Sequence, residues 1–163
     1  MNKIQASNPF FEIYSTPHGT VPFNLIKTEH YAPAIHEGIR RQNGEIDAII
    51  NNPDAPTFEN TIVPYEKSGE LLHRVNTVFG NLLSAETDDE LQELAREIMP
   101  LMSEHENNIS LNEKLFARIK TVYELADKAK LTPEQSKLLE DIYTGFVRNG
   151  ANLQGDAKEQ YRN

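Results

Sequence analysis

Cysteine is absent from the 163 residues of this chain, and several kinds of chemistry are absent with it. Thiolate catalysis, cysteine metal ligands and disulfide bridges are all excluded, although the absence does not indicate a redox compartment. Positive charge is also scarce, because 16 lysines and arginines stand against 25 acidic residues and give a formal net charge of −9. This balance argues against a surface that follows nucleic-acid phosphates, so we do not expect a nucleic-acid partner.

Long hydrophobic runs are missing as well. The longest contain only a few residues, such as residues 48–50, whereas a membrane-spanning helix needs about 20. The first seven residues contain one lysine and no apolar core, which is not the pattern of a signal peptide. We therefore expect no membrane partner and a cytoplasmic location. A periplasmic or exported location is the alternative if a signal peptide has been removed.

The zinc-protease signature is incomplete at the two places where the sequence comes near it. The pair His36-Glu37 is followed by Arg40 where a second histidine would be needed, and His105-Glu106 is followed by Ile109. A helical zinc site needs its two imidazoles four residues apart, so that both lie on one face beside the glutamate. We therefore expect no catalytic, cofactor-binding or metal-binding residue in this chain.

Apolar residues recur at three- and four-residue steps through most of the chain, which predicts an all-α fold. We expect five to six amphipathic helices in a bundle-like, mostly antiparallel arrangement, which form one helical domain over residues 28–163. In residues 1–27, prolines and glycines alternate with scattered aromatic residues. That composition predicts an extended N-terminal arm that lies over the core.

Capping residues and prolines place the expected helices along the chain. We expect helices over residues 29–51, 58–83, 87–109, 113–130 and 133–148, with N-caps at Thr28, Thr57, Asn112 and Thr132, a capping box at residues 87–90, and Lys128 and Lys130 near the end of the fourth helix. Proline removes an amide donor from a helix, so Pro64 should kink the second helix and Pro100 should bend or break the third. Residues 149–150, Asn-Gly, should end the fifth.

Five short phrases are spread over the chain: TPHGTVPF at residues 16–23, EHYAPA at 29–34, PTFENTI at 56–62, LFAR at 115–118 and FVRNGANL at 146–153. In this order and at these separations they resemble the N-terminal region of the dipeptidyl carboxypeptidase, oligopeptidase A and thimet oligopeptidase family of zinc metallopeptidases. They look most like its bacterial peptidyl-dipeptidase branch. The family's zinc-binding helix lies in a C-terminal part that this chain lacks, so no catalytic or zinc residue is carried over.

The resemblance implies a non-catalytic N-terminal helical domain, a fragment of an enzyme that hydrolyses short peptides. In that family the N-terminal helices help to wall or cover the substrate channel, and zinc is held by the catalytic domain. The implied partners are that catalytic domain and, for the whole enzyme, short peptides. Removing the rest of the enzyme should expose an apolar face, so we expect the isolated fragment to self-associate.

A self-contained helical adaptor that binds a partner in a groove is the alternative from another functional class. The end of the chain bears on this choice. Residues 156–163 begin with an N-cap and a glutamate three residues on, yet too few residues follow for a stable helix. Truncation and a natural frayed tail explain this pattern equally well.

Each conspicuous motif has both a functional and a structural interpretation, and we favour the structural one. Residues 56–61 are typical of a helix start, with substrate contact as the alternative. Residues 146–151 are typical of a helix end, and Arg148 facing a peptide carboxylate is the alternative. The acidic stretch at residues 86–90 suits the first turn of a helix better than it suits a cation site.

His73 and His105 have structural interpretations that we favour over metal binding. Glu70 and His73 form a Glu-x-x-His step, but a di-metal bundle needs that step twice with two more inward glutamates, and it occurs once. His105 falls in an apolar stripe, which predicts a buried histidine with satisfied hydrogen bonds. Neither position is expected to bind metal.

Overall fold

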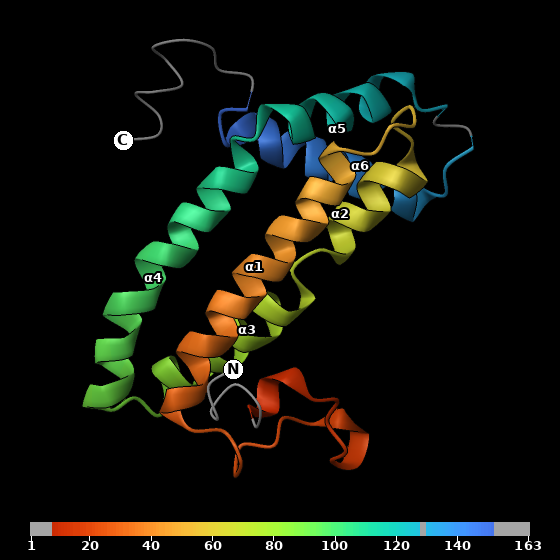
Figure 1. Ribbon diagram of the computed structural model, residues 1–163. Helices are drawn as coiled ribbons and strands as arrows, with labels where there is room; N and C mark the ends of the chain where they lie inside the picture. The colour runs from red at the N-terminus through yellow and green to blue at the C-terminus, as the bar shows by residue number, and fades with distance from the viewer. Residues whose placement is uncertain (1–7, 128–129, 152–163) are drawn as a thin grey trace. The chain divides into compact units, whose positions relative to one another are not determined.

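The computed structural model describes residues 8–127 and 130–151, and every longer regular element in these ranges is a helix (Figure 1). The predicted all-α class is therefore confirmed. The helices are α1 (Tyr31–Ile50), α2 (Val63–Lys67), α3 (Glu70–Ala85), α4 (Asp89–Ser110), α5 (Glu113–Leu125) and α6 (Pro133–Arg148). No helix in the described part is both long and apolar enough to span a bilayer. The expected segment at residues 156–163 lies outside the described residues.

Residues 8–27 contain two short 3-10 turns, Pro9–Phe11 and Pro17–Gly19, and no α-helix. Asn8 holds the start of this segment in place. Its side-chain oxygen accepts the N–H of Phe10 at 3.1 Å, and its nitrogen donates to the carbonyl of His30 at 2.7 Å. Phe10 is fully buried, so this part of the arm belongs to a core.

The described chain separates into two compact units, each with its own core. The first unit comprises residues 8–43 and 69–103. Tyr31 lies at the centre of its core, with the rings of Phe10 and Phe79 each 5.2 Å away between centroids. Burial raises the pKa of the Tyr31 hydroxyl to about 12. Arg74 donates to the carbonyl of Phe10 at 2.6 Å and so fixes the arm to α3.

The second unit comprises residues 44–68 and 104–151. Aromatic rings connect three of its helices: Phe146 of α6 lies 5.5 Å from Tyr65 of α2 and 6.0 Å from Phe116 of α5. Tyr123 and Tyr143 stack at 3.9 Å with nearly parallel rings. Offset or tilted aromatic pairs add about 0.5–1.5 kcal/mol beyond the area they bury. Helices α2, α5 and α6 thus share one apolar core.

Three of the predicted N-caps are confirmed and two helix starts were wrong. The side chains of Thr57, Asn112 and Thr132 each accept the N–H of the residue three positions on. At the start of α1 the cap position is taken by Lys27 and not by Thr28. The N–H of Lys27 is satisfied by Nδ1 of His30 at 3.0 Å, after which the short 3-10 helix Thr28–His30 leads into α1.

The start of α4 differs by one residue from the expected capping box. The side chain of Asp88, and not that of Thr87, accepts the N–H of Leu91 at 2.8 Å. A carboxylate is favoured here because it also meets the positive end of the helix dipole. Farther along, α4 continues through Pro100 as one helix, so the expected break is not found.

One continuous helix was expected over residues 58–83, and this was wrong. The chain forms a π-helical turn, Phe58–Ile62, followed by α2, and then breaks before α3. The break lies at Gly69, whose φ of +73° is in the left-handed region, where a side chain is unfavourable. A Cβ atom there would also meet the side chain of Gln42 at 2.4–2.8 Å. The apolar periodicity runs through this break and so conceals it.

The predicted end of α6 is confirmed in detail. Gly150 has a φ of +80° and donates to the carbonyl of Val147 at 3.1 Å. Ala151 donates to the carbonyl of Phe146 at 3.0 Å. These two bonds form a Schellman motif, which satisfies carbonyls that the last turn leaves without helical partners.

The two glycines inside α1 should respond in opposite ways to alanine. A Cβ on Gly38 would lie 2.9 Å from the Cα of Leu72, so Gly38→Ala should destabilise the first unit by about 1–3 kcal/mol. Gly44 has open space around it, so Gly44→Ala should stabilise by about 0.5–1 kcal/mol through helix propensity. Urea unfolding followed by circular dichroism measures both. Equal effects of the two substitutions would contradict the close approach at Gly38.

Candidate functional site

The side chain of Asn60 organises the segment between α1 and α2. The side-chain oxygen of Asn60 accepts the backbone N–H of Thr57 at 2.8 Å. The backbone N–H of Asn60 donates to the Thr57 hydroxyl at 3.1 Å, so the two residues cap the π-helical turn reciprocally. Its side-chain nitrogen donates to the carbonyl of Ala55 at 2.9 Å. The hydroxyl of Thr61 adds a further bond to the same oxygen at 2.8 Å. These bonds support the structural interpretation of residues 56–61.

Arg118 of α5 reaches the same segment from 58 to 66 residues away in sequence. It donates to the carbonyl of Asn52 at 2.9 Å and to that of Asp54 at 3.2 Å, and it lies 3.5 Å from the side-chain oxygen of Asn60. The phrases at residues 56–62 and 115–118 therefore meet in space. Sequence reasoning did not assign this role, because nothing local to Arg118 indicates a partner so distant along the chain.

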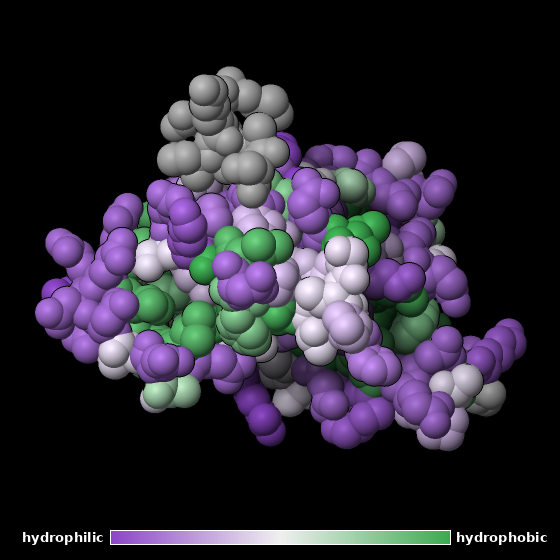
Figure 2. Space-filling view, turned by 90° about the horizontal axis from the view of Figure 1, so that it is seen from below, coloured by the Kyte–Doolittle hydropathy of each residue, from purple (hydrophilic) through white to green (hydrophobic). Residues whose placement is uncertain are grey.

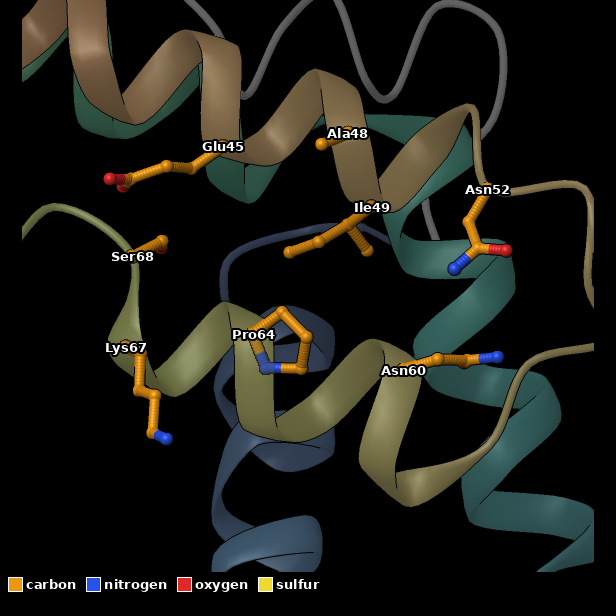
Figure 3. A pocket seen from close by; sticks show the side chains of 8 residues that line it. All are labelled: Glu45, Ala48, Ile49, Asn52, Asn60, Pro64, Lys67 and Ser68. Carbon is orange, nitrogen blue, oxygen red and sulfur yellow. The ribbon is translucent and has the colours of Figure 1, made fainter.

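A groove of about 400 Å³ lies beside this network within the second unit (Figure 3). Residues from the last turns of α1, with Asn52 just after it, form one wall, and residues of the π-helical turn and α2, with Ser68 just after it, form the other. Apolar side chains lie in the middle, with polar ones at both ends. The lining residues are Glu45, Ala48, Ile49, Asn52, Asn60, Pro64, Lys67 and Ser68.

The two His-Glu pairs have different surroundings. In α1, Glu37 binds Arg40 at 2.7 Å and Arg41 at 2.8 Å, while His36 is exposed. Hydrogen bonds from the two guanidinium groups lower the pKa of the Glu37 carboxyl to about 2. In α4, His105 is buried as predicted, and desolvation lowers its pKa despite the opposing effect of Glu106. Neither helix brings a second imidazole to the pair.

The remaining candidates lie at helix termini or on exposed surface. Glu70 and His73 are both exposed in the first turns of α3. Arg148 is exposed in the last turn of α6, near the carbonyl ends of the helix. Residues 8–127 and 130–151 contain no group of three or more histidine, aspartate or glutamate side chains placed to hold a metal ion.

Replacing Asn60 tests whether the network is structural. Asn60→Ala removes the bonds to Thr57, Ala55 and Thr61 together, so it should lower the free energy of unfolding by about 2 kcal/mol. Asn81→Ala is the matched control, because exposed Asn81 bonds only to the carbonyl of Thr77 in its own helix. It should change stability by less than about 0.5 kcal/mol. Similar losses in both variants would refute the proposed importance of Asn60.

Stability should also depend on pH through Glu37. A carboxyl whose pKa is lowered from 4.5 to about 2 stabilises the folded chain above about pH 4.5, and this contribution is lost as the pH falls toward 2. In Glu37→Gln the free energy of unfolding should therefore fall less steeply between pH 4.5 and 2. The difference from the parent chain should be no more than about 1 kcal/mol, because both arginine side chains are exposed to solvent. Glu93→Gln, in an exposed position of α4, should leave the slope unchanged.

Comparison with known proteins gives several related sequences but no matching protein-family profile. The dipeptidyl carboxypeptidase of Escherichia coli (strain K12) is 41% identical over 146 residues, which are 90% of this chain and 21% of that protein. The dipeptidyl carboxypeptidase of Salmonella typhimurium is 38% identical over 96% of this chain and 23% of its own length. Oligopeptidase A of Haemophilus influenzae is 27% identical over 95% of this chain and 22% of its own length.

The chain thus spans about a fifth of the length of the curated relatives it matches. The match extends over nearly the whole chain, as the five phrases indicated, and its extent agrees with the predicted N-terminal region. The resemblance is confirmed: this chain is related in sequence to the dipeptidyl carboxypeptidase and oligopeptidase A family of peptidases.

Proposed function

We propose that this chain is the non-catalytic N-terminal helical part of a zinc-dependent dipeptidyl carboxypeptidase-like enzyme that hydrolyses short peptides. One observation carries the proposal: relatives at 38–41% identity match 90–96% of this chain but are more than four times its matched length. A helical domain over residues 28–163, preceded by an arm over residues 1–27, belongs to the same proposal. So does a cytoplasmic location, with a periplasmic one as the alternative.

In this proposal the chain supports and walls the channel through which short peptides reach a catalytic domain. The family phrases contribute to support in several ways. Asn60 and Arg118 hold the segment after α1, Phe146 packs between helices, and His30 and Tyr31 are buried at the start of α1. Residues of this kind keep helices in fixed positions, which is what the wall of a channel requires.

Zinc does not fit the residues that this chain supplies. The position that a second ligand would occupy is taken in α1 by Arg40, a cation that pairs with Glu37, and in α4 by the aliphatic Ile109. A guanidinium group beside the site would repel a metal cation, and neither side chain can serve as a ligand. The metal and the residues that act on the scissile peptide bond therefore belong, in this proposal, to the catalytic domain.

Exposed apolar side chains support the predicted association with further protein. Figure 2 shows such side chains among hydrophilic ones on one face. Among the described residues, the large apolar side chains that are more than half exposed are Ile13, Phe23, Leu25 and Met99 in the first unit and Leu125 in the second. In the whole enzyme a catalytic domain would cover some of this surface, and in the isolated chain the same surface favours self-association. Light scattering that shows a monomer at high concentration would contradict self-association.

The groove between α1 and α2 is the observation that favours the alternative, a helical adaptor that binds a partner. The reading frame of the source gene distinguishes the two proposals. Continuation into a His-Glu-x-x-His segment would eliminate the adaptor. A stop codon directly after Asn163 would eliminate the enzyme fragment.

Activity measurements test the proposal directly. The chain, supplied with zinc and an internally quenched peptide, should release no fluorescence above buffer, because it has no zinc-bound nucleophile of its own. The same gene extended through its downstream reading frame should cleave the peptide, and a chelator should abolish that cleavage. Metal-dependent cleavage by the present chain alone would overturn the assignment.

A further inference from the structure

Arg74 of α3 forms no ion pair with any acidic side chain in the described part of the chain. Glu70 lies four residues earlier on the same helix, in the order that favours an ion pair, yet the guanidinium group points to the arm. It donates to the carbonyl of Phe10 at 2.6 Å and lies 5.2 Å from the centroid of the Tyr14 ring. A carbonyl and a ring face compensate only partly for a desolvated cation, because neither carries a full negative charge.

Three buried polar atoms of the first unit have no hydrogen-bond partner among the described residues. They are Nε of Arg74 and the hydroxyl oxygens of Tyr14 and Tyr31. Tyr31 is only 1% exposed, so its hydroxyl group cannot turn to solvent. Leaving a buried donor without an acceptor is unfavourable, and a group of three such donors therefore indicates a shared partner.

Contacts between the side chains place these three groups in one neighbourhood. The ring of Tyr31 lies 5.2 Å from that of Phe10, whose carbonyl accepts from Arg74. The guanidinium group of Arg74 in turn lies over the ring of Tyr14. Burial, and then the proximity of Tyr14, raise the pKa of the Tyr31 hydroxyl to about 12. The arm, α1 and α3 therefore each supply one group to the same part of the core.

All three groups act as hydrogen-bond donors at neutral pH. Burial raises the pKa of the Tyr14 hydroxyl, although the positive charge of Arg74 opposes this effect, so both phenols keep their protons. A guanidinium group has N–H donors and no acceptor. Three donors beside an unpaired positive charge match an acceptor that is negatively charged. That acceptor must also be small, because the atoms that would contact it are enclosed by protein.

We propose that Arg74, Tyr14 and Tyr31 together bind a small monovalent anion, of the class of chloride or formate, which connects the arm to α1 and α3. Arg74 supplies the opposite charge and one N–H, and the two hydroxyl groups donate the other hydrogen bonds. The anion fixes the arm at Tyr14, in addition to the bonds at Asn8 and Phe10. The site is independent of the proposed function, because all of its groups belong to the first unit of this chain.

Urea unfolding at neutral pH tests this site when chloride or formate replaces the bulky anion gluconate at constant ionic strength. Each small anion should raise the unfolding midpoint saturably, because a ligand that binds only the folded chain stabilises it. Gluconate should not do so. The linewidth of the chloride signal in nuclear magnetic resonance reports binding directly and should give the same affinity.

Variants of the three residues identify the donors. Arg74→Gln should weaken chloride binding about tenfold or more, as loss of a hydrogen bond to a charged group predicts. Arg96→Gln is the matched control, since it makes the same charge change at an exposed position of α4, and it should bind chloride as the parent chain does.

Tyr31→Phe separates anion binding from a role in packing, and it serves even if Arg74→Gln does not fold. The substitution removes only an oxygen that has no partner among the described residues, so in gluconate the variant should be as stable as the parent chain. Its affinity for chloride should nevertheless fall about tenfold. Equal or unsaturable responses of the parent chain to chloride and gluconate would overturn the site. So would a chloride affinity that Tyr31→Phe leaves unchanged.

Discussion

The second unit depends on how the chain leaves α1. The end of a helix presents carbonyl groups without helical partners, and the chain must then turn into the next element with its backbone polar groups satisfied. Arg118 supplies two donors to the carbonyls of this turn, and the side chain of Asn60 closes it from the other side. The ends of α1 and α2 are held as the two walls of one groove because both groups act on the same short segment.

Local chemistry accounts for what the sequence predicted correctly. A threonine or asparagine cap acts on an amide three residues away, so Thr57, Asn112 and Thr132 could be found by inspection. The all-α class and the stop at Gly150 follow from equally short-range rules. The errors at Thr28 and Thr87 have the same origin, since a neighbouring residue made the competing bond in each case.

Tertiary contacts account for what could not be predicted. The break at Gly69 depends on a left-handed backbone, while the apolar pattern continues across it. The side-chain nitrogen of Asn52 faces the groove because the side-chain oxygen accepts the N–H of Asp54 (Figure 3). The roles of Asn52 and Arg118 emerge only once the loop after α1 is folded against α5.

The π-helical turn Phe58–Ile62 has a consequence for related chains. The amide of Val63 bonds to the carbonyl of Phe58, five residues back, so this turn holds one residue more than an α-helical turn. Deletion of that extra residue would rotate everything after it by about 100° about the helix axis. Pro64 and Lys67 would then leave the groove while the overall helix content stayed the same. A related chain that lacks this one residue would therefore keep its helix content and lose the groove.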